Sequence, residues 1–165
     1  MTFWERKGFL SVLIGLSSIG KLLLLREKFP EGVLVPEAVW REVVHEGGER
    51  PGAREVATAD WITIQKVNAE GTVRLLRAEL DEGEAEDIAL AHEVGADMVL
   101  LDERDARRTA RRMGLKVLGT VGILLWAKQT GKLLSLREQL EALQSRGKFR
   151  LSQRLYERAL REAGE

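Results

Sequence analysis

Carboxylates are the residues of this chain whose spacing could support chemistry. Glu84 stands in the acidic start of a predicted helix, and Asp102 directly follows the short apolar stretch Met98–Leu101. Asp105 comes three residues later, and Glu42 lies on a helix predicted after an earlier strand. Carboxylates gathered at one edge of a sheet repel one another unless a cation lies among them. Oxygen ligands without His or Cys suit Mg²⁺ or Mn²⁺, so the spacing predicts an acidic metal pocket for phosphate chemistry.

Each of these acids also has a purely structural interpretation. Glu84 would be favoured at a helix start by the helix dipole, and Asp102 with Asp105 resembles an N-cap with its acidic partner. Glu42 would be a solvated helix residue. Spacing alone leaves both interpretations open. A functional role is most favoured for Asp102, because this residue ends a buried strand and ligands bind at that edge of α/β sheets.

A basic segment follows Asp102. It contains Arg104, Arg107, Arg108 and Arg111, several of which share a face at helical spacing. A basic helix that begins beside a metal site suits contacts with a phosphodiester backbone. The alternatives are a solvated helix paired with nearby Glu residues and a surface for an acidic protein partner.

Length and composition indicate one globular domain over residues 1–165. The 26 basic and 26 acidic residues cancel, so any binding of a polyanion must come from local clustering. The absence of Cys excludes a disulfide scaffold, a zinc ribbon and a thiol nucleophile. No apolar run approaches the roughly 18 residues of a membrane span, and the N-terminus lacks a signal peptide's features. We therefore expect a cytoplasmic protein with no membrane association.

Apolar strands alternate with helices along the chain, which predicts an α/β fold with a short parallel sheet covered on both faces, a three-layer α/β/α domain. The helices after about residue 135, to residue 165, are expected to extend it. Ser17 or Ser18 is expected to cap the first helix, which runs through Leu22–Leu25. Strands are predicted at Phe9–Leu16, Gly32–Val35, Trp61–Ile64, Met98–Leu101 and Lys116–Leu118. Further helices are predicted at Glu37–His45, Val73–Leu80, Ala85–Val94, Ala106–Met113, Gly122–Lys128, Leu136–Gln144 and Gln153–Arg161.

Other kinds of site find little support. Gly119–Gly122 lacks the spacing of a phosphate-binding loop, which weakens a nucleotide-binding interpretation, and no nucleophile elbow is present. His45 and His92 lack ligand spacing and are expected to be structural. The four Trp residues are scattered, which favours core filling over a stacking platform for bases.

At these residues the chain resembles the PIN-domain superfamily of metal-dependent ribonucleases, and in particular a PIN-like prokaryotic subfamily related to the toxins of toxin–antitoxin pairs. The resemblance covers about residues 9 to 160 and is most specific in the second half. The segments that carry it are Ser11–Ile14, Ile19–Leu22, Val35–Val43, Gly83–Asp97, Leu101–Arg107, Gly114–Leu124 and Phe149–Ser152.

The resemblance implies a role for each acid. The superfamily's two helix acids fall on Glu42 and Glu84, its strand-end acid falls on Asp102, and a further acid falls on Asp105. Its first metal-binding Asp, at the end of strand one, corresponds to Phe9. We expect Phe9 to end a buried central strand. An apolar side chain there removes one ligand and places bulk against the cation.

The resemblance therefore implies a PIN-like nucleic-acid-binding protein, a ribonuclease dependent on Mg²⁺ or Mn²⁺ with an incomplete acidic site. The four acids would bind the metal and catalyse, and Arg104, Arg107, Arg108 and Arg111 would contact RNA. The alternative is a non-catalytic, toxin-like module that binds RNA or an antitoxin-type protein. A second copy of the chain, in a homodimer, is a further candidate partner.

Overall fold

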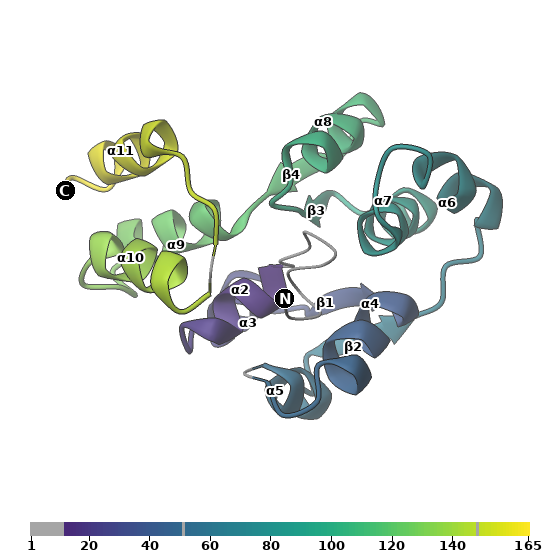
Figure 1. Cartoon of the computed structure of the whole chain (residues 1–165), viewed down its shortest axis with the longest axis horizontal. Helices are drawn as coiled ribbons and strands as arrows, with labels where there is room; N and C mark the ends of the chain where they lie inside the picture. Colours follow the sequence, from purple (N-terminus) through teal and green to yellow (C-terminus); the bar gives the residue numbers. More distant parts are fainter. Residues whose placement is uncertain (1–11, 51, 148) are drawn as a thin grey trace.

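The structure is a computed structural model that describes residues 12–50, 52–147 and 149–165. Its strands are short, parallel and separated along the chain by helices (Figure 1). β1 (Val33–Pro36) pairs with β2 (Ile62–Gln65), and β3 (Met98–Leu100) pairs with β4 (Lys116–Leu118). Parallel strands joined by helical connections confirm the predicted α/β class.

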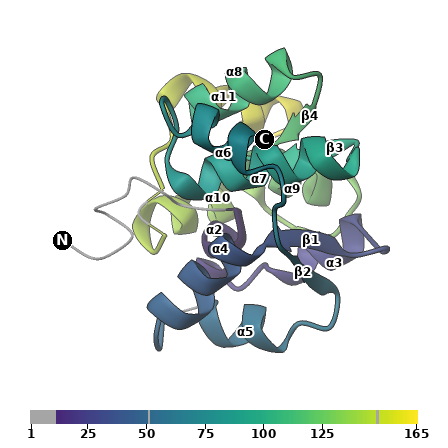
Figure 2. The ribbon, with the colours of Figure 1, turned by 90° about the vertical axis from the view of Figure 1, so that its right-hand side faces the viewer.

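The two strand pairs lie one above the other in both views (Figures 1 and 2). Helix α7 (Glu82–Val94) contacts β1 of one pair and β3 of the other. A groove of about 460 Å³, lined mainly by β1, α7 and β3, lies between the pairs. The remaining helices are α2 (Val12–Ser18), α3 (Leu23–Lys28), α4 (Glu37–Arg41), α5 (Ala53–Thr58), α6 (Glu70–Leu76), α8 (Arg104–Arg112), α9 (Thr120–Gln129), α10 (Leu136–Ser145) and α11 (Gln153–Glu162).

The strand expected at Phe9–Leu16 is wrong where the structure describes it, because Val12–Ser18 forms helix α2. Six of the seven residues of α2 are buried, so this helix shows no polar face. A short, wholly apolar run cannot be assigned to helix or strand by periodicity. Phe9, which we expected to end that strand, lies outside the described residues.

The expected serine cap is also wrong. Ser18 ends α2, and its Oγ donates a hydrogen bond back to the carbonyl of Gly15 at 2.6 Å. Helix α3 begins after Leu22, which provides no side-chain cap. Buried packing stabilises this helix start, since Leu24 and Leu25 are buried.

The helix expected over Glu37–His45 has two parts. It begins directly after Pro36 as α4 and continues from Glu42 to Glu46 as a π-helical turn, η1. A π-helical turn changes the direction in which its side chains project and often occurs at functional sites. Here the turn begins at Glu42, one of the candidate site residues.

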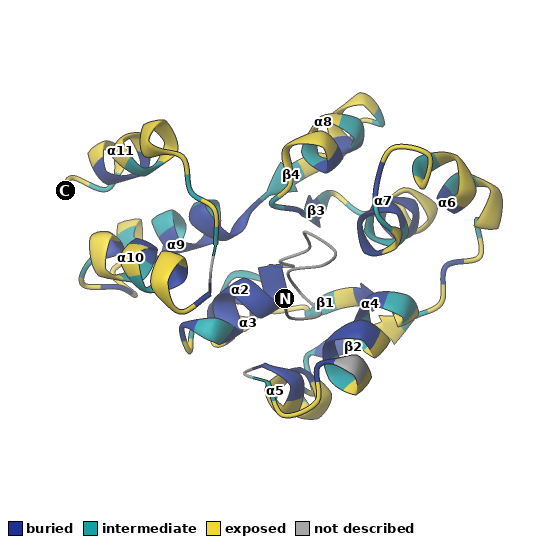
Figure 3. Cartoon of the chain, in the orientation of Figure 1, coloured by how far each residue is buried: buried dark blue, intermediate teal, exposed yellow. Residues whose placement is uncertain are grey.

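One large hydrophobic core joins the N-terminal helices, β1 and the C-terminal helices. Leu136, Leu140 and Leu143 of α10 are fully buried, so the C-terminal helices share this core (Figure 3). Two smaller clusters of buried residues lie around α7, one toward β3 and α8 and one toward α6. The Trp residues that the structure describes pack at the edge of the main core, as expected. No helix in the described ranges is long and apolar enough to cross a membrane.

Candidate acidic site

The turn after β3 holds Asp102 in a defined position. One carboxylate oxygen of Asp102, Oδ1, accepts a hydrogen bond from the backbone N–H of Thr120, and Oδ2 accepts one from the Thr120 hydroxyl. Both distances are 2.7 Å. Thr120 is the first residue of α9, so Asp102 also lies at the positive end of that helix. The side chain that ends β3 is therefore bound to the helix that follows β4.

The loop before α9 approaches this carboxylate closely. A Cβ atom on Gly119 would lie 2.8 Å from Asp102 Oδ1 and 2.6 Å from Arg107 Nη1. The same Nη1 donates a hydrogen bond to the carbonyl of Leu101 at 2.9 Å. Glycine is required at position 119 because any side chain would displace the Arg107 guanidinium or the Asp102 carboxylate.

The surroundings of Asp102 oppose its ionisation. Burial is the largest cause and raises its pKa to about 6, and the nearby Glu103 acts in the same direction. The hydrogen bonds from Thr120 and the charge of Arg107 lower the pKa but do not compensate fully. Asp102 is thus a half-buried carboxylate that is ionised at neutral pH, and its ionisation lowers the stability of the folded chain.

Glu84 lies at the start of α7 in a capping box. Its backbone N–H donates to Asp81 Oδ1 at 2.8 Å, and its Oε2 accepts from the backbone N–H of Asp81 at 3.3 Å. The structural interpretation, in which Glu84 stabilises the start of a helix, is therefore correct. Burial first, then the charges of Asp81, Glu103 and Asp105, raise its pKa to about 7. Carboxylates of α7 and of the β3–α8 turn thus act on one another electrostatically.

Glu42 of η1 and Asp87 of α7 form a second pair of acids, near the contact of α4 with α7. Glu42 is only 8% exposed, which rules out the solvated-residue interpretation. Asp87 lines the groove between the strand pairs, and its pKa is raised well above the ordinary value. Burial is the main cause, and Asp81, Glu84, Glu86 and Glu42 add to it. Glu42 and Asp87 are thus coupled through their charges.

Asp105 differs from these acids because it is exposed. It forms an ion pair with Arg108 of the next helical turn at 2.8 Å. Exposed pairs of this kind contribute little to stability and exchange readily with other partners. Asp105 therefore keeps its carboxylate at the surface, beside the start of α8.

The structure does not bring these acids together as a metal cage. Within the described ranges, no three His, Cys, Asp or Glu side chains lie close enough to hold a metal ion. The chemistry of the donors nevertheless suits a hard cation. Burial and neighbouring carboxylates raise the pKa of Glu84, Asp87 and Glu103, so a cation among them would lower their electrostatic free energy.

The arginines of α8 fall into two kinds. Arg104, Arg108 and Arg111 are exposed, and Ala106 and Ala110 form the buried side of the helix. Arg107 is half-buried and, as described, bound to the carbonyl of the β3 end. Its burial and the charge of Arg111 lower its pKa, whereas Asp102 raises it. The spacing predicted one basic helix correctly, but it did not distinguish Arg107 from the exposed residues.

Sequence reasoning missed Thr120, which is the direct partner of Asp102. The signal available was a Gly-Thr pair immediately after the β4 strand, at the edge where strand-end ligands meet. The Asp81 cap was also missed, although Asp81 and Glu84 have the spacing of a capping box.

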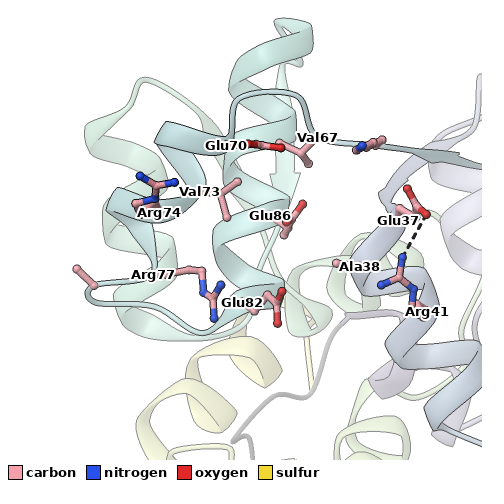
Figure 4. A pocket seen from close by; sticks show the side chains of 12 residues that line it. Glu37, Ala38, Arg41, Val67, Glu70, Val73, Arg74, Arg77, Glu82 and Glu86 are labelled. Atoms are coloured by element: carbon pink, nitrogen blue, oxygen red, sulfur yellow. Dashed lines mark hydrogen bonds and ion pairs between the residues drawn. The ribbon is translucent and has the colours of Figure 1, made fainter.

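A second groove, of about 720 Å³ and lined by residues of both charges, lies between α4, α6 and α7 (Figure 4). Glu37 and Arg41 of α4 form an ion pair at 3.2 Å on one wall, and Glu82 and Glu86 of α7 lie on the other. Four basic residues line it, Arg41, Lys66, Arg74 and Arg77, and four acidic ones, Glu37, Glu70, Glu82 and Glu86. Opposite charges in equal number give no preference for a ligand of one sign.

Comparison with known proteins gives a family match. Residues 10–165 match a protein family described as a PIN domain. No curated protein and no solved structure matches the chain significantly. The family match covers nearly the whole chain, including the four candidate acids and the basic helix. The chain therefore belongs to the PIN-domain family, as its sequence motifs predicted.

Proposed function

We propose that this PIN domain is a divalent-metal-dependent ribonuclease whose acidic site is weakened by Phe9. The observation that carries the proposal is the mutual repulsion of carboxylates from different elements. Glu84 of α7 has a pKa of about 7, first through burial and then through Asp81, Glu103 and Asp105. Perturbed acids concentrated beside a basic helix are typical of functional sites.

Glu42, Glu84, Asp102 and Asp105 are the residues that would hold Mg²⁺ or Mn²⁺. When bound, such a metal lowers the pKa of a water molecule and neutralises charge on a phosphate. The sequence resemblance puts Phe9, which supplies no oxygen ligand, at the position of the first Asp, one residue before the matched range begins. We therefore expect weak metal affinity and slow cleavage.

The exposed arginines of α8 would bind the RNA backbone. Arg104, Arg108 and Arg111 are exposed on α8, the helix that follows Asp102 and contains Asp105 in its first turn. Arg107 was expected to act with them. Its hydrogen bond to Leu101 supports a different role for it, which is to offset the charge of Asp102.

The second candidate is a non-catalytic module that binds RNA or an antitoxin-type protein. One observation favours it: among the described residues, no three His, Cys, Asp or Glu side chains lie close enough to hold a metal ion. A homodimer is a further proposal and requires a measurement of mass in solution.

Cleavage of single-stranded RNA in Mn²⁺, with EDTA as the control, tests the first proposal. We expect slow cleavage by the unmodified chain, faster cleavage by Phe9→Asp and none by Asp102→Asn. Phe9→Asp restores a ligand, whereas Asp102→Asn retains the shape and removes the charge. Fast cleavage by the unmodified chain that persists in Asp102→Asn would place the active site elsewhere.

RNA affinity, measured by fluorescence anisotropy and compared with the cleavage result, distinguishes the two candidates. Under both, Arg108→Gln and Arg111→Gln should weaken binding and reduce its dependence on salt. The matched control is Arg154→Gln, which removes an exposed charge on α11, remote in the chain. Binding without any Mn²⁺-dependent cleavage, even by Phe9→Asp, would favour the non-catalytic module.

A further inference from the structure

Thr120 makes an unusually complete contact with Asp102. Its backbone N–H and its hydroxyl each donate to a different oxygen of the same carboxylate, both at 2.7 Å. Two donors from one residue hold the plane of the carboxylate as well as its position. Each oxygen retains lone-pair capacity for another partner, so the contact orients Asp102 without saturating it.

Packing around Thr120 prevents its hydroxyl from turning elsewhere. Thr120 is fully buried, as are Ile123, Leu124 and Ala127 of the same helix. On the side of α2, a Cβ atom on Gly15 would lie only 3.3 Å from the Thr120 Oγ1. The hydroxyl therefore sits in a close-packed, water-poor position, where a lost hydrogen bond has no ready substitute.

Gly119 and Arg107 both lie close to the Asp102 carboxylate that Thr120 contacts. Gly119 leaves room for the Asp102 carboxylate, which a side chain at position 119 would displace. Arg107 also lies near this carboxylate, and its Nη1 donates a hydrogen bond to the carbonyl of Leu101. Thr120 alone supplies direct hydrogen bonds to Asp102 among the contacts of the described chain.

We infer that Thr120 is a positioning residue that sets the orientation of the Asp102 carboxylate toward the acidic site. The functional part of this inference rests on the proposed metal-dependent activity, whereas the orientation itself does not. Groups that hydrogen-bond a ligating carboxylate fix its geometry, and their loss typically lowers metal affinity 10- to 100-fold. Thr120 would thus act through Asp102 and would not touch the metal or the RNA.

The first experiment uses the metal-free protein and compares crystal structures of three variants. Thr120→Val keeps the shape and the backbone donor but removes the hydroxyl, and Thr120→Ser keeps both donors. We expect the Asp102 carboxylate to rotate or to occupy two orientations in Thr120→Val and to keep its orientation in Thr120→Ser. An unchanged single orientation in Thr120→Val would overturn the inference. Thr130→Val, in which the hydroxyl lost bonds only to carbonyls at the other end of α9, is the matched control.

The second experiment measures Mn²⁺ affinity by titration calorimetry on the same proteins. We expect Thr120→Val to bind Mn²⁺ at least about 10-fold more weakly, with Thr120→Ser and Thr130→Val close to the unmodified chain. If Thr120 had a merely structural role, Thr120→Val would lower the free energy of unfolding and leave the Mn²⁺ affinity of the folded protein unchanged. If Thr120→Val binds Mn²⁺ as tightly as the unmodified chain, the positioning role is refuted. If no protein binds Mn²⁺ but the carboxylate still turns in Thr120→Val, the orientation stands and the proposed metal-dependent function fails.

Discussion

Replacing Glu84 by Gln should stabilise the protein at pH 8. Burial and three neighbouring carboxylates hold the pKa of Glu84 at about 7, against an ordinary value of 4.5. Because the pKa is higher in the folded chain, ionisation of Glu84 lowers stability progressively between pH 4.5 and 7 and fully above pH 7. This difference in pKa corresponds to about 3 kcal/mol, which partial solvation of the carboxylate reduces to roughly 1–2 kcal/mol.

The substitution isolates charge because the amide can preserve the local structure. A Gln at position 84 can still accept the hydrogen bond that Asp81 N–H donates to Oε2, so the capping box is retained. We would measure the free energy of unfolding in urea at pH 4 and pH 8 by the fluorescence of the four Trp residues. The gain from Glu84→Gln should be roughly 1–2 kcal/mol at pH 8 and should disappear at pH 4.

Glu138 provides a matched control, because it occupies the same capping position in α10 but is exposed. Glu138→Gln should lower stability slightly, by a few tenths of a kcal/mol, through loss of charge at the helix start. Saturating Mn²⁺ at pH 8 should stabilise the unmodified chain more than Glu84→Gln. If Glu84→Gln is no more stable at pH 8 than the unmodified chain, the acidic repulsion inferred at this site is absent.

Three further predictions concern the framework around the site. Gly119→Ala should lower the free energy of unfolding by about 1–3 kcal/mol, since the new Cβ would lie 2.8 Å from Asp102 Oδ1, which Thr120 holds in place; urea unfolding checks this. Burial raises the pKa of Glu165, but hydrogen bonds from the start of α10 outweigh it and lower this pKa below its ordinary value. The ionised Glu165 carboxylate therefore stabilises the folded chain above pH 4.5, and this stabilisation is lost as pH falls. Glu165→Gln should therefore lower the melting temperature at pH 7 but not at pH 2. Leu140→Ala, in the fully buried face of α10, should cost about 2–5 kcal/mol, whereas Leu134→Ala, at 96% exposed, should leave urea unfolding unchanged.

Local sequence patterns determined much of the second half of the fold. The strand at Lys116–Leu118 was predicted with its exact bounds, and α10 and α11 to within one residue at their ends. These elements have clear apolar periodicity, and Ser135 and Ser152 cap the two helices through their hydroxyl groups. The position of Asp102 just beyond β3 was also readable, because a polar residue that ends an apolar strand marks the edge of the sheet.

Tertiary structure decided the nature of α2 and the partners of the acids. An apolar run such as Val12–Leu16 can be a buried strand or a buried helix, and packing on every side selects between them. Thr120 is 18 residues from Asp102 in sequence, and the parallel pairing of β3 with β4 brings them together. The pKa of Glu84 is likewise raised first by burial, then by Asp81 at the same helix start and by Glu103 and Asp105 near α8. A carboxylate's environment depends on burial and on charges that are close in space, and spacing along the chain does not specify either.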